Sequence, residues 1–146
     1  MNTSDKTINS ISDSEWEVMR IVWTLGNASS SEIITDLQAK KDWTESTIKT
    51  LIRRLVEKNW LTTEKDGRRF IYSAAVNQTD MMYKAAQDLL SRMCDMHKGE
   101  VILKLIADSP ISKGDLAKMT EKISKKEKDA PDMVPCNCLP GKPHMC

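Results

Sequence analysis

The sequence of 146 residues lacks the common signatures of enzymes. It has only five glycines, and none of them belongs to a glycine-rich loop of the kind that holds phosphate groups. Neither a Gly-x-Ser-x-Gly nor a His-Glu-x-x-His pattern occurs. No set of side chains suited to acid–base or nucleophilic chemistry converges, so we do not expect an enzyme.

A long apolar run is also missing. A membrane-spanning helix needs about 20 apolar residues, and no run in this sequence approaches that length. Residues 1–15 have neither the basic start nor the apolar middle of a signal peptide. We therefore expect a cytoplasmic protein. In reducing cytosol, clustered thiols bind metal or sense redox state more often than they form disulfides.

Charge of one sign is not in excess, because the chain has 22 Lys and Arg against 21 Asp and Glu. The chain as a whole is therefore neither a polybasic arm nor an acidic tail. The balance hides a local asymmetry. Residues 1–43 carry four basic and seven acidic side chains, whereas residues 44–72 carry seven basic and four acidic ones. Positive charge is thus concentrated in the second of these segments.

The spacing of apolar residues predicts three helices in the N-terminal half. The first begins after Ser12, where Glu15 completes a capping box, and stops at Gly26-Asn27. Ser30 is predicted to cap a short second helix, and Thr44 is predicted to cap the third.

Two short strands are predicted within residues 61–75, around a turn at Asp66-Gly67. Three helices and a hairpin are typical of a winged helix-turn-helix, whose third helix enters the major groove of DNA. The excess positive charge falls on this helix and the hairpin. The candidate DNA-binding residues are short hydrogen-bond donors, cations and one tryptophan: Trp43, Thr44, Ser46, Thr47, Lys49, Thr50, Arg53, Arg54, Lys65, Arg68 and Arg69.

The alternative for the basic helix is an ordinary solvated face. The order of the helices, the hairpin turn and the paired arginines beside it together favour DNA. Trp43 has its own alternative, because it fits equally well as a partly exposed cap over the core.

A second helical region begins near Thr79. Apolar residues recur at helical spacing from Met82 to Met93, in the nearly continuous run 101–107, and again after Ser112. These stripes are too narrow to make a good independent core. We expect a second copy of the chain to cover them in a homodimer.

Residues 129–146 hold four of the five prolines and show no periodicity, so they are predicted to form a tail. The tail contains three of the four cysteines. Thiolates suit Cu(I) and Zn(II). A Zn(II) site with four ligands could use Cys136, Cys138, Cys146 and His144, while Cu(I) could use the sulfurs alone, with Met145 as a further candidate.

The fourth cysteine, Cys94, follows the apolar stripe of Leu89, Leu90 and Met93. Buried cysteines are common and often inert. We therefore expect Cys94, together with His97, to be a packing residue of that helix.

Residues 12–76 resemble the penicillinase-repressor (BlaI/MecI) family of winged-helix repressors. The segments that carry the resemblance are SDSEWEVMRIVW, SSSEIITDL, DWTESTIKTLIRRLVEKNWL and GRRFIYSA. The cysteine tail narrows it to the copper-responsive branch, the CopY/CopR-type repressors. The fold expected is mainly α with a small β-hairpin. Residues 1–76 form the winged-helix DNA-binding domain, 77–128 a helical dimerisation region and 129–146 a flexible, Cys-rich metal-binding tail.

The resemblance implies a homodimer that binds an inverted-repeat operator and represses copper-homeostasis genes. It further implies release when Cu(I) replaces Zn(II) in the tail, with a copper chaperone as a further partner that delivers Cu(I). The tail departs from the branch's pattern of two Cys-x-Cys pairs four residues apart. Pro143 and Met145 stand at the next two cysteine positions, and Cys146 falls one place late.

Two other functions stay open at this point. A copper-buffering or chaperone protein would bind the metal without preferring an operator. A thiol-redox-responsive regulator would form disulfides in its tail and leave DNA when it meets peroxide without copper.

Overall fold

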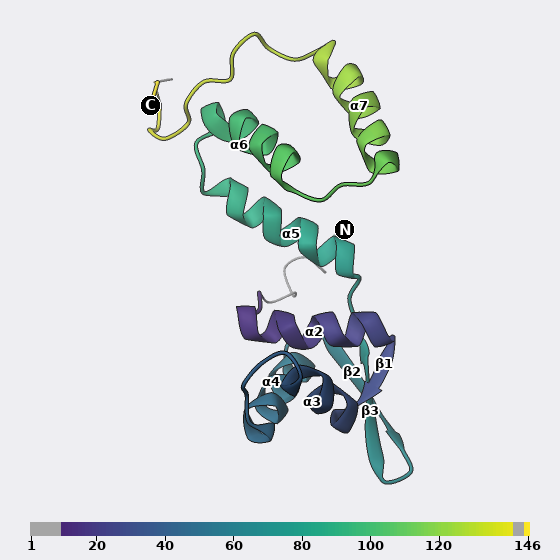
Figure 1. The fold of residues 1–146 in the computed structure, drawn as a ribbon. Coiled ribbons are helices and arrows are strands. Elements are labelled where there is room, and N and C mark those ends of the chain that lie inside the picture. The colour runs from purple at the N-terminus through teal and green to yellow at the C-terminus, as the bar shows by residue number, and fades with distance from the viewer. Residues whose placement is uncertain (1–9, 142–144) are drawn as a thin grey trace. The chain divides into compact units, whose positions relative to one another are not determined.

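The computed structural model describes residues 10–141 and 145–146, and it divides into two compact units, Met1–Ala85 and Ala86–Cys146 (Figure 1). Among its described residues, the first unit contains three helices and a small sheet, and helix α5 (Gln78–Ser91) runs across the division. The predicted mainly α fold with a winged helix-turn-helix is confirmed.

The helices of the first unit begin at side chains that cap them. Helix α2 (Asp13–Leu25) starts after Ser12 with the predicted capping box, and it ends at Gly26, whose φ of 85° favours glycine. Helix α3 (Ser30–Gln38) differs by one residue from the prediction. Its N-cap is Ser29, whose hydroxyl accepts a hydrogen bond from the backbone of Glu32 at 3.2 Å.

The sheet has one strand more than the sequence predicted. Strands β2 (Leu61–Asp66) and β3 (Arg69–Ala74) form the hairpin, and β1 (Asn27–Ser29) pairs antiparallel with the other edge of β3. The loop of the hairpin begins at Gly67, with a φ of 67°, one residue later than predicted. The hairpin projects beyond the three helices (Figure 1).

In the first unit, helices α2, α3 and α4 each contribute one apolar face to a single core. Helix α4 (Glu45–Glu57) buries four residues along one side, so its other side faces solvent. Three indole rings, those of Trp16, Trp23 and Trp60, cluster at the edge of this core, with centroids 5.6–6.3 Å apart. The Trp23 Nε1–H donates to the carbonyl of Val76 at 3.0 Å, which ties α2 to the segment that leads into α5.

A buried ion pair joins α2 to the end of α4. The side chain of Glu15 is 2% exposed, and its Oε1 lies 2.9 Å from the Lys58 Nζ, whose side chain is 31% exposed. Burial raises the pKa of Glu15, but hydrogen bonds from the Ser12 backbone and the Lys58 ammonium outweigh burial and hold that pKa below its ordinary value. The ionised form of Glu15 therefore stabilises the fold above the ordinary pKa of a glutamate, and this contribution is lost as the pH falls.

Replacing Lys58 by methionine is expected to lower the free energy of unfolding at neutral pH by about 2 kcal/mol, because the buried Glu15 carboxylate loses its cation. The difference from the unaltered chain should narrow as the pH falls below the ordinary pKa of a glutamate, about 4.3, and should vanish once Glu15 is protonated in both chains. Chemical denaturation across pH measures this. Lys49→Met is the matched control, because it breaks an exposed pair with Glu45, and its expected cost is below about 0.5 kcal/mol. Equal costs at neutral pH for the two variants would contradict the prediction.

The remaining helices bury little. Within the described residues, α6 (Asp95–Asp108) and α7 (Lys113–Glu127) bury no side chain, and α5 buries only Met81. Their exposed large apolar residues are Met82, Tyr83, Leu89, Ile102, Leu103, Leu105, Leu116 and Ile123. No helix of the described residues combines the length and apolar character that crossing a bilayer requires.

Candidate functional site

The outward face of α4 carries most of the predicted DNA-binding residues. At its start, the Thr44 hydroxyl accepts a hydrogen bond from the backbone N–H of Thr47 at 3.1 Å, which confirms Thr44 as the N-cap. The Thr50 hydroxyl is half-buried and donates to the carbonyl of Ser46 at 3.0 Å. The other predicted side chains of this helix are exposed: Ser46, Thr47, Lys49, Arg53 and Arg54.

Trp43 stands just before this helix. Its ring is half-buried and packs against the core, with the Lys41 ammonium 6.0 Å from the ring centroid. Its carbonyl accepts a hydrogen bond from the side chain of Gln38 at 3.2 Å, which fixes the connection between α3 and α4. The structure thus places Trp43 both over the core and beside the exposed N-terminus of α4.

The cations of α4 form loose ion pairs within the helix. Lys49 lies 2.9 Å from Glu45 and Arg53 lies 3.5 Å from Glu57, each pair one turn apart. All four side chains are well exposed, and exposed pairs of this kind contribute less than about 1 kcal/mol. The cations can therefore exchange their carboxylates for another anion at small cost.

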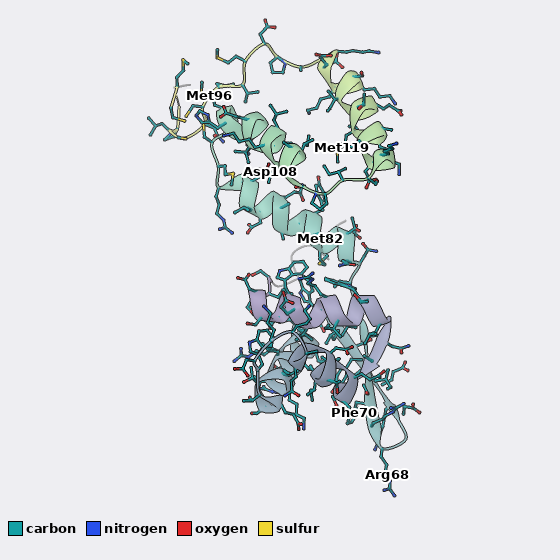
Figure 2. The ribbon with its side chains drawn as sticks, viewed as in Figure 1. Arg68, Phe70, Met82, Met96, Asp108 and Met119 are labelled. Carbon is teal, nitrogen blue, oxygen red and sulfur yellow. The ribbon has the colours of Figure 1, made fainter. Side chains whose placement is uncertain are left out.

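The hairpin presents a second group of cations. Lys65, Arg68 and Arg69 are all exposed, and Arg69 makes only a long contact of 3.8 Å with Asp66. Arg68 lies in the loop and points away from the three helices (Figure 2). The helix face and the hairpin tip together give the first unit two exposed basic surfaces.

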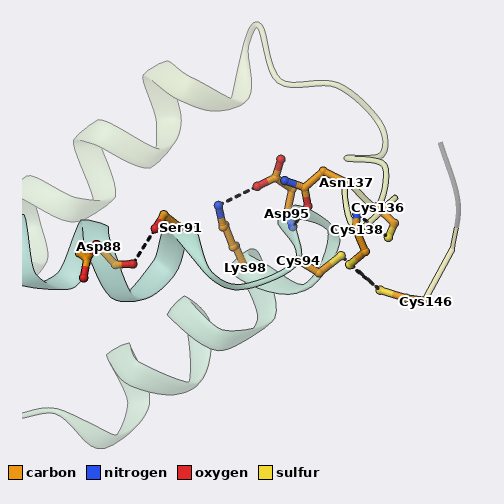
Figure 3. A network of polar contacts seen from close by, with 9 residues as sticks. All are labelled: Asp88, Ser91, Cys94, Asp95, Lys98, Cys136, Asn137, Cys138 and Cys146. Atoms are coloured by element: carbon orange, nitrogen blue, oxygen red, sulfur yellow. Dashed lines mark hydrogen bonds and ion pairs between the residues drawn. The ribbon is translucent and has the colours of Figure 1, made fainter. Parts of the chain in front are cut away.

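Four thiols lie together in the second unit. The sulfur atoms of Cys94, Cys136, Cys138 and Cys146 are all within 4.8 Å of one another (Figure 3). The sulfurs of Cys94 and Cys146 lie 3.2 Å apart, and the sulfur of Cys138 lies 4.0 Å from that of Cys146. Cys136 is buried and its sulfur accepts a hydrogen bond from the backbone of Cys138 at 3.3 Å.

The cluster forms because the chain returns to the start of α6. Cys94 is the N-cap residue of this helix, and its own side chain makes no capping hydrogen bond. The side chain of Asn137 supplies that bond instead, accepting from the backbone N–H of Asp95 at 2.9 Å. Asn137 stands between two of the tail cysteines, so capping the helix brings their thiols to Cys94.

The spacing of the four sulfurs suits a thiolate-bound metal ion. A tetrahedral Zn(II) site with bonds of about 2.3 Å places its sulfurs about 3.8 Å apart, close to the sulfur separations in the cluster. Soft Cu(I) accepts the same ligands.

Hydrogen bonds within the cluster give its thiols different pKa values. A bond from the Cys146 thiol lowers the pKa of Cys94 to about 6. Bonding to Cys136 raises the pKa of Cys138 to about 11, and bonding to Cys94 raises that of Cys146 to about 12. Cys94 is thus the most acidic of these three thiols, and its sulfur accepts the hydrogen bond from the Cys146 thiol.

The cluster differs by one residue from the predicted ligand set. The structure brings Cys136, Cys138 and Cys146 together as predicted, while His144 lies outside the described residues and Met145 is exposed. Cys94 was expected to be a packing residue of the preceding helix, and this was wrong. Helix α5 ends at Ser91, so Cys94 begins a new helix with its sulfur toward the tail. The local sequence around Cys94 gave no signal of this role.

Comparison with known proteins gives matches along most of the chain. The family model described as Penicillinase repressor matches residues 11–125. An uncharacterized 16.5 kDa protein from the ptsI 3′ region of Latilactobacillus sakei is 48% identical over 92% of this chain and 92% of its own length. The methicillin resistance regulatory protein MecI of Staphylococcus aureus (strain N315) is 31% identical over 84% of this chain and 99% of its own length.

A solved structure titled as the CopR repressor shares 40% sequence identity with this chain. The match covers 47% of this chain and 100% of that one, with a TM-score of 0.41.

Proposed function

The chain belongs to the penicillinase repressor family of transcriptional repressors, and on that premise we propose that it is a copper-responsive repressor of the CopY/CopR type. In this proposal a homodimer binds an inverted-repeat operator of copper-homeostasis genes. It leaves the operator when Cu(I) replaces Zn(II) among the clustered thiols. An operator-binding repressor acts in the cytoplasm, where its DNA is.

The single observation that carries the proposal is the four-thiol cluster in a chain whose first unit is a winged helix. Such a cluster is unsuited to contact DNA directly, since thiolates are anionic and repel the phosphate groups. Thiolates are instead the preferred ligands of Zn(II) and Cu(I). A DNA-binding unit joined to a thiolate site is the arrangement that a metal-controlled repressor needs.

Operator binding is assigned to the outward face of α4 and to the hairpin. In a winged helix-turn-helix the third helix enters the major groove, and α4 is the third helix among the described residues of this unit. Its N-terminal hydroxyls and backbone amides suit close contact with bases and phosphates, while its cations and those of the hairpin suit phosphates.

A homodimer is assigned to the second unit. Helices α6 and α7 bury no side chain within the described residues, yet they expose Ile102, Leu103, Leu105 and Ile123. Large apolar side chains gathered on exposed helices often mark a surface that a partner covers. A second copy would cover them with two-fold symmetry, and a two-fold dimer matches an inverted-repeat operator.

The switch requires that the two metal forms differ in operator affinity. A 100-fold loss of affinity corresponds to about 2.7 kcal/mol of coupling. Zn(II) prefers four ligands in a tetrahedron, and Cu(I) accepts sulfur ligands in other arrangements. A rearrangement of the four thiols and of the segments that carry them can supply a difference of this size.

Arg53→Ala is expected to weaken operator binding and to lower the slope of log affinity against log salt by about 0.9, the value for one lost phosphate contact. Titrations at several salt concentrations measure the slope. Arg92→Ala is the matched control. Like Arg53, Arg92 is an exposed arginine paired with a carboxylate four residues away. The Arg92 and Arg53 side chains are 69% and 64% exposed, but Arg92 lies just after α5, outside the α4 face. A slope that Arg53→Ala leaves unchanged would remove this residue from the interface.

The proposal is tested by operator binding of the full chain with Zn(II), with Cu(I) or with a chelator. We expect tight binding with Zn(II) and release by Cu(I). Metal binding without any operator preference would favour the copper-buffering alternative. The contact of 3.2 Å between Cys94 and Cys146 also gives the redox alternative a physical basis. Release by peroxide in the absence of copper, without release by Cu(I), would favour that alternative.

We do not propose a copper chaperone as a partner, since none of the relatives points to one.

A further inference from the structure

We propose that Cys94 is a metal ligand and that metal binding fastens the C-terminal tail to the start of α6. This inference rests on the metal-binding function proposed above and goes beyond it. In this inference the metal ligands come both from the helical region and from the tail, so the site links the two segments.

The first argument is the count and placement of sulfurs. The tail provides three thiols, and a tetrahedral thiolate site needs a fourth ligand. Cys94 supplies it from 42 residues before Cys136, with its sulfur 3.2 Å from that of Cys146. Every pair among the four sulfurs is within 4.8 Å, so Cys94 is an equal member of the group and not a neighbour of it.

The second argument is that a separate contact already directs the tail to this position. The side chain of Asn137 caps α6 through the backbone N–H of Asp95, at 2.9 Å. This bond involves no sulfur, so it positions Cys136 and Cys138 beside Cys94 independently of any contact between thiols. The site is therefore preorganised before a metal ion arrives, which reduces the ordering cost of binding.

The third argument is electrostatic. A tetrathiolate site of Zn(II) carries a net negative charge, and the N-terminus of a helix carries a partial positive charge. Cys94 holds its sulfur at the N-terminus of α6, a helix of fourteen residues. The position therefore favours the charged, metal-bound form over the neutral thiols.

A metal ion bound to Cys94 would act directly on the helices of the second unit. Residues 92–94 connect α5 to α6, and a metal ion bound to Cys94 would hold this connection against Cys136, Cys138 and Cys146. Helix α6 also carries Ile102, Leu103 and Leu105, which belong to the apolar surface that we assign to the dimer. Exchange of Zn(II) for Cu(I) would thus act on the helical region without requiring the tail to touch the DNA-binding unit.

The test compares Cys94→Ser with the unaltered full chain, using Co(II) as a spectroscopic substitute for Zn(II). Serine is a favoured N-cap residue, so α6 should remain folded, which circular dichroism checks. The thiolate-to-cobalt charge-transfer band should correspond to four thiolates in the unaltered chain and three in Cys94→Ser. Zn(II) affinity, measured against a chromophoric chelator, should fall at least tenfold. Met119→Ser, which removes a half-buried sulfur from α7, should leave the band and the affinity unchanged.

The outcomes separate this inference from the function on which it rests. A three-thiolate band in both the unaltered chain and Cys94→Ser, with equal Zn(II) affinity, would overturn the role of Cys94. The operator could still be released by Cu(I) in that case. An unaltered chain that bound neither Co(II) nor Zn(II) would overturn both. A further supporting result would be slower amide exchange at Asp95 and Met96 on metal loading, lost in Cys94→Ser.

Discussion

Replacing Cys136 and Cys138 together by serine is expected to leave an operator-binding dimer that no longer responds to copper. The two residues are half of the four sulfurs in the cluster, and Cys136 is the buried one. The two thiols that remain cannot complete the four-sulfur site that holds Zn(II), so the exchange of Zn(II) for Cu(I) within that site is lost. If Cu(I) weakens the operator complex of the unaltered chain 100-fold, we expect less than a threefold change in this variant. Fluorescence anisotropy of a labelled operator during a Cu(I) titration measures both.

The matched control makes two serine substitutions in the same tail without removing a thiol. Met133 and Val134 are exposed, so Met133→Ser with Val134→Ser should retain the copper response. Normal release of the double-cysteine variant by Cu(I) would show that the cluster is not the sensor. A control that also lost its response would instead show that the response depends on the tail as a whole.

Replacing Ile102 and Leu105 by glutamine is expected to convert the dimer to monomers and to weaken operator binding. These residues lie one turn apart on α6 and are 43% and 53% exposed. Burying one such side chain fully contributes about 1.5–3 kcal/mol, and the two substitutions remove four side chains from a two-fold dimer. Because these side chains are already about half buried in one chain, we take half of the lowest total, about 3 kcal/mol. A loss of this size weakens dimerisation more than 100-fold. Sedimentation velocity gives the oligomeric state, and titration with full and half operators gives the affinity.

A monomer should bind a half operator as well as the unaltered chain does, because the first unit is intact. Glu100→Gln with Lys104→Gln provides the control, since it places two glutamines on exposed positions of the same helix without removing apolar surface. A glutamine variant at Ile102 and Leu105 that remained dimeric at micromolar concentration would remove this face of α6 from the dimer interface.

The sequence predicted the winged helix well because its local signals agree with its packing. Capping residues mark the starts of α2 and α4, and apolar spacing gives the buried faces of α2, α3 and α4. Gly67 marks the hairpin turn because its positive φ favours glycine. Each of these features depends on residues within a few positions of one another.

The errors arose where the structure depends on distant residues. Strand β1 has three residues, too few for an alternating pattern, and it forms because β3 offers it an edge. The predicted start of α3 was one residue too late because each of three consecutive serines can serve as an N-cap. The position of Glu32, three residues after Ser29, decides among them.

Cys94 shows the same limit in the candidate site. Its role depends on the tail returning over 42 residues to cap α6 through Asn137, and no local pattern announces that contact. The tail cysteines could be predicted because their clustering is visible in the sequence itself. The fourth sulfur of the cluster required the fold.

The tryptophans give this protein an optical property of its own. Trp16, Trp23 and Trp60 form one cluster within the first unit, while Trp43 lies beside the exposed start of α4. Their emission will therefore carry two separate signals, since unfolding disperses the cluster and occupation of the α4 face changes the surroundings of Trp43. The unlabelled repressor can in this way be followed by its intrinsic fluorescence, with Trp43→Phe isolating the emission of the cluster.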